Sequence, residues 1–382
     1  MEALFKRGGR MKIIGIDLHS NRFTCFIILK DNSYKTITFE LSAKGFKEFL
    51  SYVDKDTYIM VEASTNTFRF VERIREHVKC VFVANTHKLK LISLVKKKTD
   101  KLDAEKLAIF LKMQLKSGEQ IIEPVHVPSI LIQQLRSLFT TYRLLKKQIG
   151  QIKNRIHSLY KQELMPFTKE YIFGKKNRKM LKEISINPVA DFQLNQMFLE
   201  LESKEIRIEE LKNYIYYLSK PYRKQIDTLT SIKGISIFTA VALIADISDI
   251  KRFKNSRKLS SYLRSAPGVD ISNETIRNLK TNKMGRKLSI TLISQSLNHF
   301  RDSNNKLNRW YEKKIEHSKP KGKARMAICR KVFTEIFQML KKEEYHYFRD
   351  EKNHKEKMKK YDNFFKNYIV DKRYEYIFDK PA

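Results

Sequence analysis

Residues 12–18 have the sequence KIIGIDL, a short apolar run that predicts a buried strand with an acid near its end. Further strands are predicted at residues 22–30, 34–41, 57–63 and 80–84, and helices at residues 43–52, 68–78, 87–95 and 102–115. Three successive strands followed by alternating helices and strands are the element order of an RNase H-like fold. We therefore predict an α/β RNase H-like domain over residues 11–122.

The composition indicates a folded protein that binds a polyanion. Hydrophobic residues make up 42% of the 382 residues, enough for the cores of two or three domains. The chain has 77 Lys and Arg against 42 Asp and Glu, a net charge of +35. Such a chain repels itself unless a polyanion neutralises it, so nucleic acid is the expected partner. A ribosome-associated protein and a binder of anionic membranes are the alternatives.

The cysteines and the hydropathy of the sequence indicate the cellular compartment of the protein. Cys25, Cys80 and Cys329 are far apart and form no CxxC pair, so neither a disulfide nor a zinc site is expected. No signal-peptide pattern follows the basic first residues, and no apolar run reaches the roughly 20 residues of a membrane helix. We therefore expect a bacterial cytoplasmic protein, associated with the nucleoid, with no membrane partner.

Four acids stand where an α/β sheet can gather them. Asp17 ends the first predicted strand, Glu62 ends the fourth, and Asp100 and Asp103 open a helix one turn apart. Strand ends and helix starts can meet at one edge of a sheet, and Mg²⁺ prefers oxygen ligands; two such ions can hold the attacking and leaving oxygens of a phosphodiester. Each acid alone could instead cap a turn or a helix start. His19 could also lie near this site, but a lone histidine after a strand is more often a turn residue.

Residues 128–220 predict a central coiled-coil hairpin. Apolar residues in alternating steps of four and three run through residues 131–159, about four heptads. A second helix at about residues 194–218 has a matching apolar seam, so the two helices could pack within one chain or across chains. Lys153 and Arg155 flank the first seam and could lie along nucleic acid or simply face solvent.

Residues 226–345 predict a mainly α-helical domain. The segment LTSIKGISIFTAVALIADI at residues 229–247 has the outline of a helix-hairpin-helix. Its turn at Lys233 and Gly234 would present backbone N–H groups to phosphates. Ser236 stands where a second glycine is usual, so a plain helical turn is the alternative.

The rest of this region predicts loops, basic stretches and a tail. Residues 266–274 predict a turn-rich loop, in which Ser272 by itself would be a turn residue. Lys283 and Arg286 follow in a basic stretch and are candidate nucleic-acid contacts. The tail at residues 346–382 mixes Lys with Tyr and Phe, and could stack on bases or pack on the domain.

These features together resemble a known family. The acids Asp17, Glu62, Asp100 and Asp103, the heptads, and the segments IKGIS, SYLRSAPGVDISNE and NKMGRK resemble the Asp-Glu-Asp-Asp (DEDD) transposases of the insertion-sequence 110 family. The resemblance implies a RuvC-like N-terminal domain whose four acids hold Mg²⁺, as a two-ion site. It also implies a C-terminal transposase domain whose serine attacks a DNA phosphate and forms a covalent phosphoserine link.

The resemblance places that serine at Ser272. The matching positions are Tyr262, Leu263, Pro267 and the element Lys283-Met284-Gly285. Arg264 and Asn273 stand where the family has glycine, which leaves Ser265 and Thr275 as near competitors for Ser272.

The resemblance also implies partners. Domains from different protomers would form one active site, the chain would assemble as a dimer or tetramer through the coiled coil, and a structured non-coding RNA would bridge donor and target DNA. The alternatives are a metal-dependent RNase H-like nuclease or Holliday-junction resolvase that uses water, and a non-catalytic nucleic-acid-binding protein.

Overall fold

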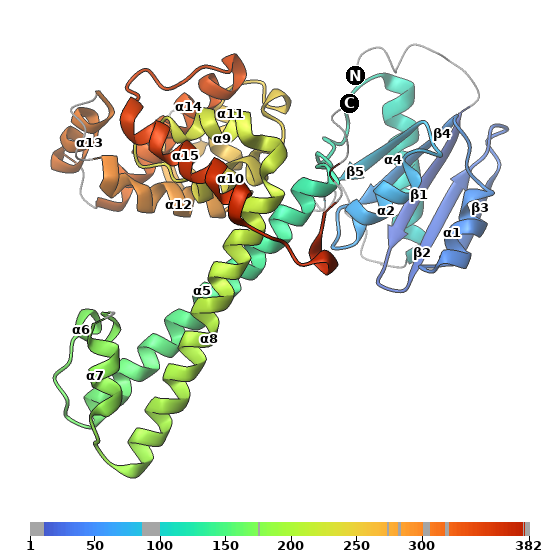
Figure 1. The fold of residues 1–382 in the computed structure, drawn as a ribbon. Helices are drawn as coiled ribbons and strands as arrows, with labels where there is room; N and C mark the ends of the chain where they lie inside the picture. Colours follow the sequence, from blue (N-terminus) through green and yellow to red (C-terminus); the bar gives the residue numbers. More distant parts are fainter. Residues whose placement is uncertain are drawn as a thin grey trace. The chain divides into compact units, whose positions relative to one another are not determined.

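The structure is a computed structural model that describes residues 11–85, 100–174, 176–272, 275–281, 284–300, 306–317, 321–376 and 378. The chain divides into two compact units, Met1–Pro128 and Ser129–Ala382, and each is described by itself (Figure 1). The helix predicted at residues 87–95 lies outside the described residues. Within the described part of the chain, no helix is long and apolar enough to cross a membrane.

The first unit is built on a mixed five-stranded sheet with the order β3-β2-β1-β4-β5. Its strands are β1 (Lys12–Leu18), β2 (Arg22–Ile28), β3 (Tyr34–Glu40), β4 (Thr57–Glu62) and β5 (Cys80–Ala84). β1, β2 and β3 form an antiparallel meander, whereas β4 runs parallel to β1 and β5 runs parallel to β4. The predicted order of strands and helices is confirmed for the described residues, and it is consistent with an RNase H-like domain.

Helices cover both faces of this sheet (Figure 1). Helices α1 (Ala43–Leu50) and α2 (Thr67–Ile74) pack on the face that includes Ile14. Helix α4 (Asp100–Ser117) packs on the opposite face, which includes Ile13. Neighbouring residues of β1 therefore contribute to two different cores, as expected for side chains that alternate along a strand.

Gly15 allows α4 to lie very close to β1. A Cβ at this position would lie 2.0 Å from the Ala104 carbonyl oxygen and 2.4 Å from the Ala108 amide nitrogen. Any side chain at position 15 would therefore push the helix backbone away from the strand.

The second unit begins with two long helices. α5 (Ile130–Gln162) and α8 (Pro188–Leu218) lie side by side and run in opposite directions, joined through α6 (Lys169–Phe173) and α7 (Asn177–Glu183) (Figure 1). The buried cluster between them includes Ile152, Ile156 and Leu159 of α5 and Leu194, Leu201 and Ile208 of α8. The two apolar seams therefore meet within one chain.

The remainder of the second unit is mainly helical. Its helices are α9 (Arg223–Thr230), α10 (Ile237–Ile247), α11 (Ser256–Tyr262), α12 (Leu288–Ser296), α13 (Lys306–His317), α14 (Lys321–Lys342) and α15 (Glu351–Asn367), with short 3-10 turns at Lys220–Tyr222, Ile250–Arg252, Leu297–Phe300 and Lys372–Tyr374. Every residue of α10 after the first is buried. This apolar helix forms the centre of the core, with α5, α9 and α12 packed around it.

A β-hairpin replaces the loop predicted at residues 266–274. β6 (Pro267–Ser272) pairs antiparallel with β7 (Thr275–Thr281). The loop prediction was wrong, because the Pro-Gly pair at residues 267–268 begins a strand here and not a turn. Val269 and Ile271 alternate with polar residues, which is the period of a strand.

The C-terminal tail packs on the second unit. Met358 and Tyr361 of α15 are buried in its core. Further along, the Tyr376 amide donates a hydrogen bond to the Tyr217 hydroxyl at 3.1 Å. Of the two interpretations of the tail, packing on the domain is the one the fold supports for these residues.

Candidate functional site

Asp17, the second-last residue of β1, and Glu62, the last residue of β4, lie on the same face of the sheet in neighbouring parallel strands. Ile16 of β1 pairs with Val61 of β4, so the next residue of each strand is one of these acids. Met60, two residues before Glu62, packs in the cluster beneath α4. Because strand side chains alternate between faces, both carboxylates lie on the face that α4 covers.

Asp100 and Asp103 lie in the first turn of α4, close to Asp17. Burial raises the pKa of the Asp17 carboxyl above its ordinary value, and the negative charges of Asp100 and Asp103 raise it further, whereas His19 lowers it. The carboxylates of Asp100 and Asp103 are therefore near enough to Asp17 to repel its negative charge at one edge of the sheet.

His19 lies between two of these acids. Its Nε2 atom is 3.1 Å from Asp17 Oδ2 and 3.2 Å from Asp100 Oδ1. Among the described residues, Asp17, His19 and Asp100 form a group whose potential ligand atoms all lie within 4.8 Å of one another. Of the two interpretations of His19, a place near the acids is the one that this geometry supports. The available signal was the Asp-x-His spacing, because residues two apart in an extended segment share a face.

Positive side chains accompany the acids of α4. Arg22 Nη2 is 3.0 Å from Asp100 Oδ2, and Lys106 Nζ is 3.1 Å from Asp103 Oδ1. Burial alone would raise the pKa of Asp100, but the Arg22 hydrogen bond and the His19 charge leave that pKa lowered. Clustered carboxylates with cations beside them are a donor set that a hard divalent metal ion could bind.

In the second unit, Ser272 is the last residue of β6, and its backbone is paired with Thr275. The side chain of Ser272 and the whole of Lys283 lie outside what the structure describes. The competitor Ser265 is fully buried, and its hydroxyl donates to the Ser260 carbonyl at 2.9 Å.

The base of this hairpin is fastened to the end of α11. The Arg286 amide donates to the Tyr262 carbonyl at 2.9 Å, and Arg264 Nε donates to the Gly285 carbonyl at 2.7 Å. Gly285 has φ +105°, and a Cβ there would lie 2.2 Å from the Tyr262 carbonyl oxygen. Glycine is therefore required at this position by both conformation and space.

A buried acid that the sequence reasoning missed holds the same segment. Asp246 is 1% exposed and lies 2.8 Å from Arg286 Nε. The other Asp246 oxygen accepts hydrogen bonds from the Ser289 amide at 3.0 Å and the Ser289 hydroxyl at 2.8 Å. The signal in the sequence was a single acid within the apolar run of α10.

The turn between α9 and α10 contains Lys233 and Gly234, and Gly234 has φ +87°. Lys357 of α15 donates from Nζ to the carbonyls of Thr230 at 3.4 Å and Ile235 at 3.1 Å, on either side of this turn. The turn is therefore held by the C-terminal helix as well as by its own helices.

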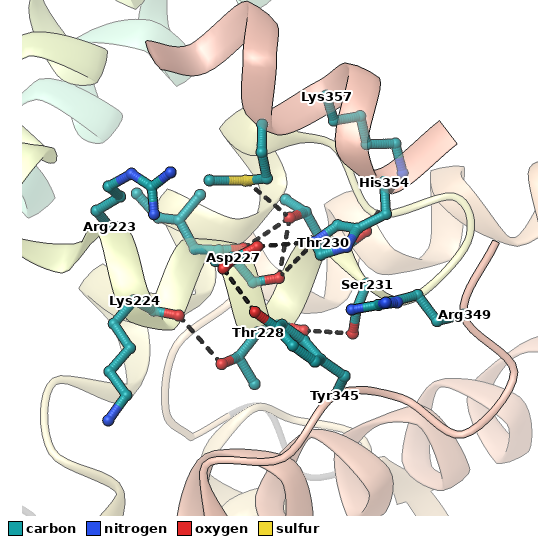
Figure 2. Close-up of polar contacts among 12 residues, drawn as sticks. Arg223, Lys224, Asp227, Thr228, Thr230, Ser231, Tyr345, Arg349, His354 and Lys357 are labelled. Atoms are coloured by element: carbon teal, nitrogen blue, oxygen red, sulfur yellow. Dashed lines mark hydrogen bonds and ion pairs between the residues drawn. The ribbon is translucent and has the colours of Figure 1, made fainter. Parts of the chain in front are cut away.

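Figure 2 shows a second attachment of the C-terminal segment to α9. Asp227 accepts a hydrogen bond from the Tyr345 hydroxyl at 2.8 Å, and its other oxygen lies 2.9 Å from His354 Nε2. The His354 side chain is 6% exposed. These contacts tie the segment after α14 to the helix that precedes the predicted phosphate-binding turn.

The two predicted nucleic-acid contacts on α5 differ in their surroundings. Lys153 Nζ is 3.4 Å from Glu205 Oε1 and lies over the Phe173 ring, 5.0 Å from its centroid. Arg155 is exposed. Neither side chain is part of the acid group of the first unit.

Two family models match the chain on these regions. One, described as "Transposase" and built on DEDD transposases of the IS110 type, matches residues 14–165, and the other, "Transposase IS116/IS110/IS902 family", matches residues 226–305. The first spans the acid group and the second spans the hairpin that carries Ser272.

The chain belongs to the IS110 family of transposases.

The transposase also resembles a curated relative. It is 23% identical over 267 residues to the transposase for insertion sequence element IS1533 of Leptospira borgpetersenii, and the alignment covers 66% of this chain and 74% of the relative. The protein is thus a DNA transposase, with DNA as its partner. A DEDD transposase domain implies dependence on a divalent metal ion.

Proposed function

We propose that the transposase cuts and rejoins DNA through a covalent link between Ser272 and a DNA phosphate, with Mg²⁺ held by Asp17, Glu62, Asp100 and Asp103. The observation that carries the proposal is the gathering of Asp17, Asp100 and Asp103 at one edge of the sheet, with Glu62 on the adjacent strand and the same face.

The donor set fits such an ion. Oxygen ligands come from two strand ends and one helix start, elements fixed by the cores on both sides of the sheet. When bound, Mg²⁺ supplies positive charge that stabilises the phosphate oxygens during substitution. Arg22 and Lys106 already place positive charge against Asp100 and Asp103.

The serine step conserves a phosphodiester. The Ser272 oxygen forms a bond to phosphorus, the bond from phosphorus to one deoxyribose oxygen breaks, and the serine proton passes to that leaving oxygen. Reversal with a different DNA hydroxyl rejoins the strands without an external energy source. The burial of Ser265 behind its hydrogen bond to Ser260 favours Ser272 over that competitor.

The test is to trap the covalent adduct. Full-length protein is incubated with Mg²⁺, DNA of both element ends and its RNA, then separated under denaturing conditions. We expect a protein–DNA adduct from the wild type and from Thr275→Ala, and none from Ser272→Ala or Asp17→Asn. Normal strand exchange by Ser272→Ala would instead support a nuclease or resolvase that uses water. No metal-dependent strand chemistry with any partner would support a non-catalytic binding protein.

We also propose a homo-oligomer, in which a composite site is completed by domains of different protomers. On α8, Phe192, Leu199 and Ile206 recur every seven residues and are 66%, 50% and 61% exposed. This row of exposed apolar residues has a heptad period and lies outside the interface between α5 and α8. A helix of another protomer could pack on it. We expect Leu199→Glu with Ile206→Glu to give a smaller species in sedimentation, whereas Ile369→Glu, at a 92% exposed site outside the stripe, leaves the mass unchanged. A monomeric wild type with nucleic acid bound would contradict the proposal.

The partner that sets target choice is proposed to be a structured non-coding RNA, acting with the protein at the bacterial nucleoid. The net charge of +35 suits a surface shared by RNA and DNA. Sequencing RNA that copurifies from the native host should recover one species encoded beside the gene, able to pair with both DNA junctions. Random fragments alone would contradict RNA guidance.

A further inference from the structure

We propose that His19 is a nitrogen ligand of the divalent metal, together with Asp17 and Asp100, and that it strengthens binding of Co²⁺ relative to Mg²⁺. The inference rests on the metal site in the proposed function. It adds to the acids a ligand of a different chemical kind.

The geometry carries this inference. His19 Nε2 is 3.1 Å from one Asp17 oxygen and 3.2 Å from one Asp100 oxygen, so a single ring atom faces both carboxylates. The three potential ligand atoms lie within 4.8 Å of one another, a separation that one ion can span. Asp17 comes from β1 and Asp100 from the start of α4, so His19 contacts acids of two different elements.

The backbone fixes where the imidazole lies. The His19 amide donates to the Arg22 carbonyl at 3.0 Å, which closes the turn between β1 and β2. β1 and β2 are paired up to Leu18 and Phe23, at the edge of that turn. The His19 side chain is 42% exposed, so solvent ions can reach its ring.

The chemistry of imidazole determines the expected metal preference. A neutral histidine has one ring nitrogen with a free lone pair, which can bind a metal ion. A nitrogen ligand binds Co²⁺ more strongly than Mn²⁺, whereas Mg²⁺ binds oxygen ligands in preference to nitrogen. If His19 only hydrogen-bonds to the acids, removing it should weaken all divalent ions alike.

The experiment uses the full-length protein with metal ions alone. Mn²⁺ is bound to the wild type, His19→Ala, His19→Gln and the control His77→Ala, an exposed histidine of the same unit. Electron spin echo envelope modulation then reports nitrogen bonded directly to Mn²⁺. Calorimetry gives the affinities for Co²⁺ and Mg²⁺, and circular dichroism verifies that each variant is folded.

We expect directly bound nitrogen in the wild type and His77→Ala, and its loss in both His19 variants. Removal of His19 should lower the Co²⁺ affinity by about tenfold or more, with a clearly smaller change for Mg²⁺. Mn²⁺ that binds to the wild type without directly bonded nitrogen overturns the role of His19 and leaves the proposed function standing. No Mn²⁺ binding to the wild type overturns both, and equal weakening of Co²⁺ and Mg²⁺ overturns the selectivity.

Discussion

Replacing Gly15 by alanine should separate the helix that carries two of the candidate metal ligands from the strand that carries a third. In the structure, the new Cβ would lie 2.0 Å from the Ala104 carbonyl oxygen. A real Cβ essentially never lies under 3.0 Å from such an atom, so α4 must retreat by about 1 Å. The obstacle is backbone, which cannot rotate away as a side chain could.

The retreat should cost stability as well as function. Buried residues of α4, among them Leu107 and Leu111, would lose close packing on the sheet. Overpacking of this kind costs about 2–3 kcal/mol. For a unit of this size each kcal/mol lowers the melting temperature by about 3–5 °C, so we expect a fall of about 6–15 °C.

The metal readout makes the prediction specific. Asp100 and Asp103 would move with α4 while Asp17 stays on β1, so Mn²⁺ titrated into the full-length protein should bind more weakly. Gly150→Ala is the matched control, because a Cβ at Gly150 meets nothing within 4 Å. That control lies within helix α5, where alanine is favoured over glycine by about 0.5–1 kcal/mol. Gly15→Ala with the melting temperature and Mn²⁺ affinity of the wild type would refute the close-approach argument.

Three further outcomes follow from buried or paired acids. Asp246→Asn should cost about 2–3 kcal/mol in urea unfolding, because it breaks the ion pair with Arg286, and an unchanged midpoint would contradict a structural role for that pair. Glu205 accepts two hydrogen bonds from Arg178, which hold the pKa of Glu205 below its ordinary value of 4.5. This stabilisation is present above pH 4.5 and is lost as the pH falls through the lowered pKa of Glu205. Glu205→Gln should therefore be less stable than the wild type at pH 7 and equally stable in acid. A difference in melting temperature that stays the same at every pH would contradict a role for the Glu205 charge. Asp227→Ala should increase amide exchange in the segment after α14, as measured by mass spectrometry, and unaltered protection would argue against the attachment shown in Figure 2.

Local patterns in the sequence predicted most elements of the first unit. The run at Cys80–Ala84 is a strand with the predicted bounds, and β1 covers the whole of KIIGIDL. These are buried segments whose periodicity depends on their immediate neighbours. Local patterns alone could not predict that Asp17 and Glu62 lie close together, because this proximity depends on β4 pairing with β1 in parallel register.

The close approach at Gly15 depends on a contact between distant residues. Gly15 matters because Ala104, in a helix far along the chain, rests against it. Nonlocal packing of this kind leaves no short-range period in the sequence. The hairpin of β6 and β7 is a local element with a strand period, and it was missed because the Pro-Gly pair at its start favours a turn.

The position of Arg286 bears on how the second unit presents Ser272. The positive charge and the glycine beside it suggested a contact to phosphate, yet Arg286 Nε lies against the buried Asp246. The Arg286 amide donates a hydrogen bond to the Tyr262 carbonyl, and Gly285 lies so close to that carbonyl that no side chain would fit. We therefore infer that this element acts mainly by fixing the base of the hairpin. Because a serine that must meet a phosphate needs a defined position, rigid anchoring here would serve catalysis.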